Sequence, residues 1–136
     1  MRRGEVLEIT ELLKDPATTI AVVGANDDPA KYGGRVYRDL KAKGFTVFAL
    51  NPNRDTVDGD PAFASLDALP EPPTIVNFVV PPPQTLRILH QCKELNLFNI
   101  WVQPGAESDE VLEYLASEGF SYLANSCIMV RAVSVA

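Results

Sequence analysis

The stretch IAVVGANDDPAKYGG, residues 20–34, indicates the fold. Ile20–Val23 is a run of apolar residues that leads into Gly24, and a polar segment able to start a helix follows. A strand, a glycine turn and a helix in this order are typical of a phosphate-binding site, because backbone amides at a helix N-terminus can face an anion. The G-x-G-x-x-G spacing of a dinucleotide site is missing, so the stretch leaves the ligand open.

The rest of the chain alternates short apolar runs with helix-like segments. Strands that alternate with helices of ten or more residues predict βαβ units and a mainly parallel sheet. We therefore expect an α/β fold: a single Rossmann-like, doubly wound domain whose five strands have the order 3-2-1-4-5, with helices on both faces. The strands are expected at 20–23, 45–52, 74–81, 98–104 and 120–125, the helices at 5–14, 30–43, 84–96 and 107–119, and a helical turn at 65–69.

Length and composition are those of one ordinary globular domain. The chain has 136 residues, and we expect residues 1–136 to form one unit, with an N-terminal helix and linker at 1–16 and a tail at 128–136 that the pattern does not place. No apolar run reaches the roughly 18 residues of a membrane span, and no apolar signal core follows the N-terminus. We expect a cytoplasmic protein that does not bind membranes.

Charge argues against nucleic acid as a partner. The net charge is −6, whereas a nucleic-acid surface needs clustered basic residues on one face. Six of the twelve lysines and arginines nevertheless lie between residues 31 and 54, so a local anion site fits an acidic protein.

The sequence offers no metal cluster and no catalytic set. Cys92, Cys127 and the single histidine, His90, cannot supply a convincing zinc site. We interpret His90 as a solvated helix residue and expect both cysteines to be reduced. Cys127 is the nearest candidate for a nucleophile, but no base is assigned to it, and no triad or carboxylate pair is evident. We therefore expect neither a metal nor a catalytic residue.

Ligands of doubly wound sheets bind outside the carboxyl ends of the strands, so the turns after the strands form the candidate site. Gly24 lets the backbone approach a ligand closely, and this role is favoured over the alternative that it serves only a tight turn, because Gly33 and Gly34 also open the start of the helix. Lys31 and Arg35 can add charge-assisted contacts to a phosphate.

The other turns narrow the choice of ligand. An NAD site needs a carboxylate after the second strand to bind the ribose, and Asn51-Pro52 stands there instead. VVPPP, residues 79–83, is compatible both with a rigid connection and with an apolar wall beside a ligand. Gln103 is the better polar candidate after the fourth strand, since Trp101 is more typical of a core residue.

Five motifs, taken together and in order, resemble the CoA-binding Rossmann domain family of small bacterial proteins, which is related to the CoA-binding domain of the succinyl-CoA synthetase α subunit. The motifs are VVGANDDPAKYG, ALNPN…DG, VVPPP, WVQPGAES and NSC, and the resemblance covers about residues 10–130. It implies coenzyme A or an acyl-CoA as the ligand. Asn26 departs from the pattern, because the family usually has serine there.

The resemblance also implies which part of the ligand each turn contacts. The first turn would hold the phosphates, the second would lie along the adenosine, and the last two would edge the deeper pocket of the pantetheine arm. The implied residues are Gly24, Ala25, Asn26, Lys31, Tyr32 and Gly33 at the phosphates; Asn51, Pro52 and Arg54 at the adenosine, with Arg54 at its 3′-phosphate; Val80 and Pro81 beside the adenine or pantetheine; and Gln103, Gly105, Asn125 and Cys127 at the deeper pocket.

The expected function is binding of CoA or acyl-CoA without catalysis. The synthetase also uses a phosphorylated histidine in a further domain, which this sequence does not contain, so its chemistry is not implied. Two alternatives stay open: an enzyme of acyl or thiol transfer that uses Cys127, and a sensor module that binds a pyridine nucleotide.

Overall fold

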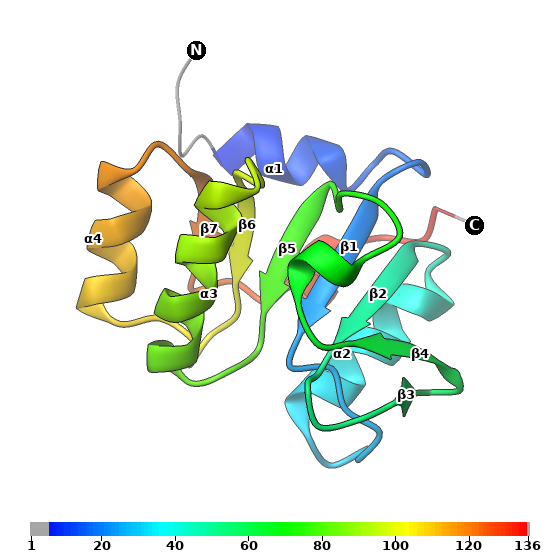
Figure 1. The fold of residues 1–136 in the computed structure, drawn as a ribbon. Coiled ribbons are helices and arrows are strands. Elements are labelled where there is room, and N and C mark those ends of the chain that lie inside the picture. Colours follow the sequence, from blue (N-terminus) through cyan, green and yellow to red (C-terminus); the bar gives the residue numbers. More distant parts are fainter. Residues whose placement is uncertain (1–5, 136) are drawn as a thin grey trace.

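The computed structural model describes residues 6–135, and Figure 1 shows their fold. Seven strands form one sheet in the order β3-β4-β2-β1-β5-β6-β7. The strands are β1 Thr19–Val23, β2 Thr46–Leu50, β3 Thr56–Val57, β4 Asp60–Phe63, β5 Ile75–Phe78, β6 Asn99–Val102 and β7 Ser121–Ala124. The helices are α1 Val6–Leu12, α2 Tyr32–Ala42, α3 Pro82–Glu94, α4 Asp109–Ser117 and α5 Ile128–Arg131, with a 3₁₀ turn, η1, at Leu66–Ala68.

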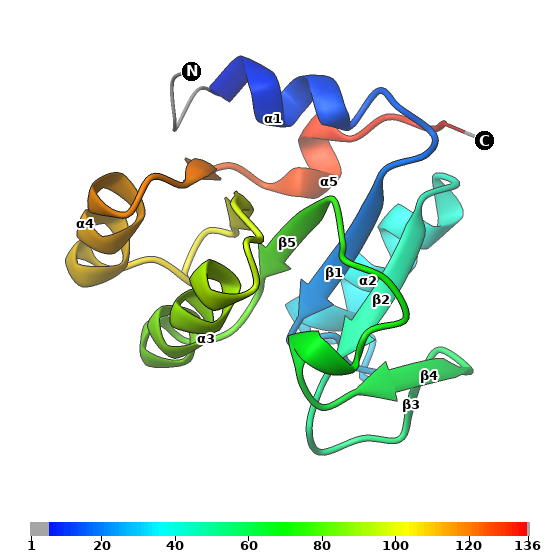
Figure 2. The ribbon, with the colours of Figure 1, turned by 45° about the horizontal axis from the view of Figure 1, so that its top comes forward.

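Helices cover both faces of the sheet and bury a core on each side. In Figure 2, α3 and α4 lie on one side, while α1, α2 and α5 lie on the other. Leu89 of α3 and Leu115 of α4 belong to the first core, and Leu40 of α2 and Ile128 of α5 belong to the second. β1 is buried along its whole length, as its continuous apolar sequence predicts for a central parallel strand.

The observed pairing confirms an α/β, Rossmann-like fold with a mainly parallel sheet. β1 pairs in parallel with β2 and β5, and the parallel ladder continues through β6 to β7. β3 and β4 form the one antiparallel pair among the described strands.

The predicted strand number and order were wrong. The connection after β2 contains two further strands, and β4 pairs in parallel with β2 at the place that the prediction gave to residues 74–81. That segment, β5, pairs with β1 instead. β4 is only four residues long and contains Pro61, so it carries no apolar run that a sequence pattern could detect.

Two other segments differ from the prediction. α3 starts at Pro82, within the prolines rather than after them, because a proline at the first helical position loses no hydrogen bond. The tail contains α5 and then returns to α2, where the Val135 amide donates to the carbonyl of Lys43 at 2.7 Å. Among the helices of residues 6–135, none combines the length and apolar character that a membrane crossing requires.

Candidate ligand-binding site

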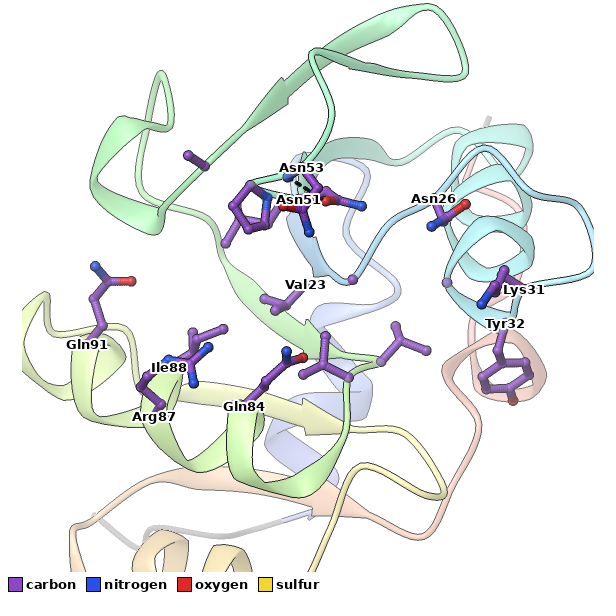
Figure 3. A pocket seen from close by; sticks show the side chains of 17 residues that line it. Val23, Asn26, Lys31, Tyr32, Asn51, Asn53, Gln84, Arg87, Ile88 and Gln91 are labelled. Atoms are coloured by element: carbon purple, nitrogen blue, oxygen red, sulfur yellow. Dashed lines mark hydrogen bonds between the residues drawn. The ribbon is translucent and has the colours of Figure 1, made fainter.

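A pocket of about 590 Å³ lies at the carboxyl ends of the central strands, within the size range of small-molecule sites. Figure 3 shows its walls: the start of α2 on one side, α3 on the other, and the loop after β2 between them. The lining residues are Val23, Gly24, Asn26, Lys31, Tyr32, Gly33, Leu50, Asn51, Pro52, Asn53, Ala64, Val79, Val80, Gln84, Arg87, Ile88 and Gln91.

Close backbone packing shapes the turn after β1. Gly24 has φ +100°, and a Cβ there would lie 2.7 Å from the carbonyl oxygen of Val79. A Cβ on Gly33 would lie 2.0 Å from the carbonyl oxygen of Gly24. Any side chain at either position would displace the turn, so both glycines are needed to bring α2 this close to the end of β1.

Asn51 joins the two loops that border the pocket. Its Nδ2 donates to the carbonyl oxygen of Ala25 at 2.9 Å, and its Oδ1 accepts from the Asn53 amide at 2.9 Å. A carboxylate at this position could not donate to Ala25. The asparagine therefore fixes the spacing of the loops as well as lining the cavity.

One wall of the pocket was missed by the sequence analysis. Gln84, Arg87, Ile88 and Gln91 of α3 line the cavity, and their spacing of three, four and seven residues places them on one helix face (Figure 3). The sequence does contain a signal for this wall: polar residues, including an arginine, recur at helical spacing on one face of α3.

The charged residues that line the pocket are both basic. They are Lys31, next to the first turn of α2, and Arg87, on α3; no aspartate or glutamate belongs to the lining. Neither side chain forms an ion pair within the described part of the chain, although the protein is acidic overall. An anionic ligand would therefore meet two cations and no opposing carboxylate.

Three of the predicted residues, Tyr32, Gln103 and Cys127, contact one another at the edge of the pocket. The Tyr32 hydroxyl donates to Cys127 Sγ at 2.8 Å, and Gln103 Nε2 lies 3.3 Å from that hydroxyl and 3.4 Å from the sulfur. Gln103 is fully buried, and its Oε1 accepts from the Ile128 amide at 2.8 Å. This cluster adjoins the pocket through Tyr32, which lines it.

The cluster changes the acidity of its members. Burial, together with the hydrogen bond to Cys127, raises the pKa of Tyr32 to about 12. Burial also raises the pKa of Cys127, but hydrogen bonds from Tyr32, Gln103 and backbone amides outweigh it and leave that pKa below its ordinary value. By contrast, burial raises the pKa of the Cys92 thiol to about 12. On these directions of the pKa, we expect Cys127 to be the more reactive of the two cysteines.

Seven predicted site residues lie outside the pocket lining: Gln103 and Cys127, which belong to the cluster described above, and five others. The Arg54 guanidinium is 2.6 Å from the Asp27 carboxylate, and its Nε donates to the carbonyl oxygen of Thr56. Ala25 is buried, Pro81 is the N-cap of α3, Gly105 donates its amide to Glu107, and Asn125 is an exposed turn residue with φ +61°. Eight predicted residues do line it: Gly24, Asn26, Lys31, Tyr32, Gly33, Asn51, Pro52 and Val80.

Two side chains outside the pocket behave as the sequence suggests. Trp101 is fully buried, and its Nε1 donates to the carbonyl oxygen of Ser126 at 2.8 Å. His90 is exposed and packs against Tyr114. In the described part of the chain, no group of three or more His, Cys, Asp or Glu residues could hold a metal ion.

Comparison with known proteins supports a CoA-binding domain. The family model described as "CoA binding domain" matches residues 18–132. A conserved hypothetical protein from Pyrococcus furiosus is 41% identical, with a TM-score of 0.80, over 83% of this chain and 97% of its own. A Thermus thermophilus protein is 32% identical, with a TM-score of 0.81, over 92% of this chain and 94% of its own.

A curated relative is much longer than this chain. The α subunit of the ADP-forming acetate–CoA ligase II of Pyrococcus furiosus is 26% identical over 80% of this chain. The match covers 26% of that subunit, so this chain spans about a quarter of the relative's length.

Proposed function

The chain belongs to the CoA-binding domain family, and from that premise we propose that it binds coenzyme A or an acyl-CoA in the pocket at the carboxyl ends of β1, β2 and β5. It holds the ligand and carries out no reaction of its own. One observation carries the proposal: the glycine turn that suits a phosphate opens into a pocket whose charged lining residues are two cations without ion-pair partners in the described chain.

Each wall of the pocket has a part in this binding. Backbone amides after Gly24 and the Lys31 ammonium bind the pyrophosphate, as at other helix N-termini. The loop with Asn51 and Pro52 lies along the adenosine. The pantetheine arm runs past Val80 toward Tyr32, behind which the thiol of Cys127 lies.

Calorimetric titration of the purified protein with CoA tests the proposal. We expect a dissociation constant below 1 mM for the wild type and roughly tenfold weaker binding for Lys31→Ala, which loses one charge-assisted contact. Arg35→Ala is the matched control: the sequence suggests Arg35 as a second phosphate contact, but the structure places this exposed cation of α2 outside the pocket lining. Wild-type protein that binds no CoA at sub-millimolar concentration rules the proposal out.

A second candidate function is acyl transfer to Cys127. It is favoured by the lowered pKa of that thiol and by its contact with Tyr32, a pocket residue. The thiolate would attack the thioester carbonyl of acyl-CoA, the acyl group would move to the cysteine, and CoA would leave as the thiolate.

Mass spectrometry after incubation with acetyl-CoA distinguishes the two functions. An acetyl adduct on the wild type that is absent from Cys127→Ser supports transfer. If the wild type binds acetyl-CoA but stays unmodified, transfer is ruled out and binding without reaction is supported.

A further inference from the structure

The two cations of the pocket lie on opposite walls. Lys31 stands beside the turn after β1, whereas Arg87 projects from α3 on the far side of the cavity, as Figure 3 shows. The loop after β2, with Asn51 and Asn53, lies between them. A single compact anion could not use both side chains fully, so the arrangement suits a ligand with two separate anionic groups.

The position of the glycine turn fixes which group lies where. A pyrophosphate held by the turn after β1 lies beside Lys31. In doubly wound sheets the ribose lies at the end of the second strand, which here is Asn51-Pro52. The nucleoside then occupies the space between that loop and α3, which Leu50, Ala64 and Ile88 also line. Arg87 is the cation on this side of the pocket.

Arg54, the sequence-based candidate for the 3′-phosphate, is already engaged. Its guanidinium pairs with the Asp27 carboxylate at 2.6 Å, and the other oxygen of Asp27 accepts the Asp58 amide at 2.6 Å. These contacts hold the pKa of Asp27 below its ordinary value, with the Asp58 amide the largest cause. A phosphate placed at Arg54 would therefore meet a neighbouring carboxylate of like charge.

We infer that Arg87, and not Arg54, binds the 3′-phosphate of the adenosine and gives this pocket its preference for CoA over dephospho-CoA. The inference rests on the proposed function, because it assumes that CoA occupies the pocket. It adds a specificity-determining residue on α3, which none of the sequence motifs contains.

Titration of CoA and dephospho-CoA into the same set of proteins tests the inference. The wild type should prefer CoA by about tenfold, the usual contribution of one charge-assisted hydrogen-bonded contact. Arg87→Gln should reduce the preference to less than about twofold while its affinity for dephospho-CoA stays near that of the wild type. Arg54→Gln should keep the full preference.

Arg131→Gln serves as the matched control, since Arg131 is an exposed arginine of α5 outside the pocket lining. Thermal unfolding of each variant checks that the fold is intact. The inference is overturned if Arg87→Gln keeps the preference, if Arg54→Gln loses it, or if the wild type shows none. Wild-type protein that binds neither ligand rejects the proposed function itself, which separates the two failures.

Discussion

Gly33 is the residue at which the first turn of α2 meets the loop after β1. A Cβ at this position would lie 2.0 Å from the Gly24 carbonyl oxygen, and backbone rather than a flexible side chain would have to move. We expect Gly33→Ala to lower the free energy of unfolding by up to about 3 kcal/mol, the upper end of the usual cost of overpacking, and to weaken CoA binding. Urea denaturation and calorimetry measure the two effects.

Gly59→Ala is the control for this substitution. Gly59 lies in the turn between β3 and β4 with φ +79°, and a Cβ there would meet no atom within 4 Å. Alanine should therefore cost only the backbone strain of about 1–2 kcal/mol and leave CoA binding unchanged. Equal loss of CoA affinity in both variants would show that the contact at Gly33 has no special part in the pocket.

Cys127 should react faster than an ordinary cysteine, and Tyr32 should be a cause. Burial raises the pKa of the thiol, but hydrogen bonds led by the Tyr32 hydroxyl lower it further than burial raises it. We expect alkylation by iodoacetamide to have its pH midpoint below about 8.5, the ordinary value for cysteine. Tyr32→Phe should move that midpoint upward, because the thiolate loses a donor.

Peptide mapping assigns the modified residue. Cys92, which is buried and whose pKa is raised to about 12, should stay unmodified in the folded protein. An unchanged midpoint in Tyr32→Phe would mean that the hydroxyl does not stabilise the thiolate.

Two carboxylates of the β3–β4 hairpin, Asp58 and Asp60, contact side chains of α2, and Asp60 makes the closer contacts. Asp60 Oδ2 accepts from the Tyr37 hydroxyl at 2.7 Å and lies 2.8 Å from Lys41 Nζ. The hydrogen bonds from Lys41 and Tyr37 hold the pKa of Asp60 below its ordinary value despite some burial. We expect Asp60→Asn to be about 1 kcal/mol less stable than the wild type at pH 7.

The pH dependence of this difference has a defined sign. Because the folded pKa of Asp60 is depressed, its stabilising contribution is complete above the unfolded value of about 3.9 and is lost as the pH falls through the lower, folded value. The gap between the wild type and Asp60→Asn should therefore close in acid. Urea titrations at pH 7 and below pH 3 measure it, with Asp55→Asn, an exposed aspartate of the same connection, as the control.

The elements differ in how far their sequences reveal them. The five parallel strands β1, β2, β5, β6 and β7 follow from their apolar runs, and glycine marks the turn after β1. β4 could not be predicted in this way, because this short strand near the edge of the sheet contains Pro61 and shows no alternation of apolar and polar residues. It forms by pairing with β2 and β3. The missed strand also explains the wrong strand order.

The α3 wall shows a second limit, which concerns helix rotation. α3 buries Thr85, Leu89 and Cys92 against the sheet, and this packing turns Gln84 and Arg87 toward the pocket. The sequence predicts the helix, but its rotation about its own axis depends on contacts with strands far along the chain. Residues that follow β1, β2 and β5, such as Gly24, Asn51 and Val80, could therefore be predicted for the site, whereas the orientation of residues on a helix face could not.

For the molecule as a whole, the sheet order explains where the pocket lies. From β1 the chain moves outward through β2 to β4, then crosses back to β5 on the other side of β1 and continues outward to β7. The segments after β1 and β5 are packed together at Gly24 and Val79, but they lead to α2 on one face of the sheet and to α3 on the other, so a crevice opens between the two helices where the winding reverses. Val23, Gly24, Val79 and Val80 lie on its two sides and line the pocket.

Because the pocket is built from both halves of the sheet, a ligand bound there should stabilise the entire fold. A ligand at 100 times its dissociation constant adds about 2.7 kcal/mol to the free energy of unfolding, which corresponds to a rise of roughly 10 °C in Tm for a domain of this size. We expect CoA to produce this rise in a thermal unfolding scan.

NADH is the matched comparison at the same concentrations, because it also carries a pyrophosphate and an adenosine but needs a carboxylate after the second strand for its ribose hydroxyls. Asn51 cannot supply that carboxylate, and both ends of its amide already bond Ala25 and Asn53. NADH should therefore raise Tm by less than about 2 °C, as expected for a ligand present near its dissociation constant. An equal rise with NADH would identify a general dinucleotide site, and a rise with NADH alone would favour a pyridine-nucleotide sensor over a CoA-binding protein.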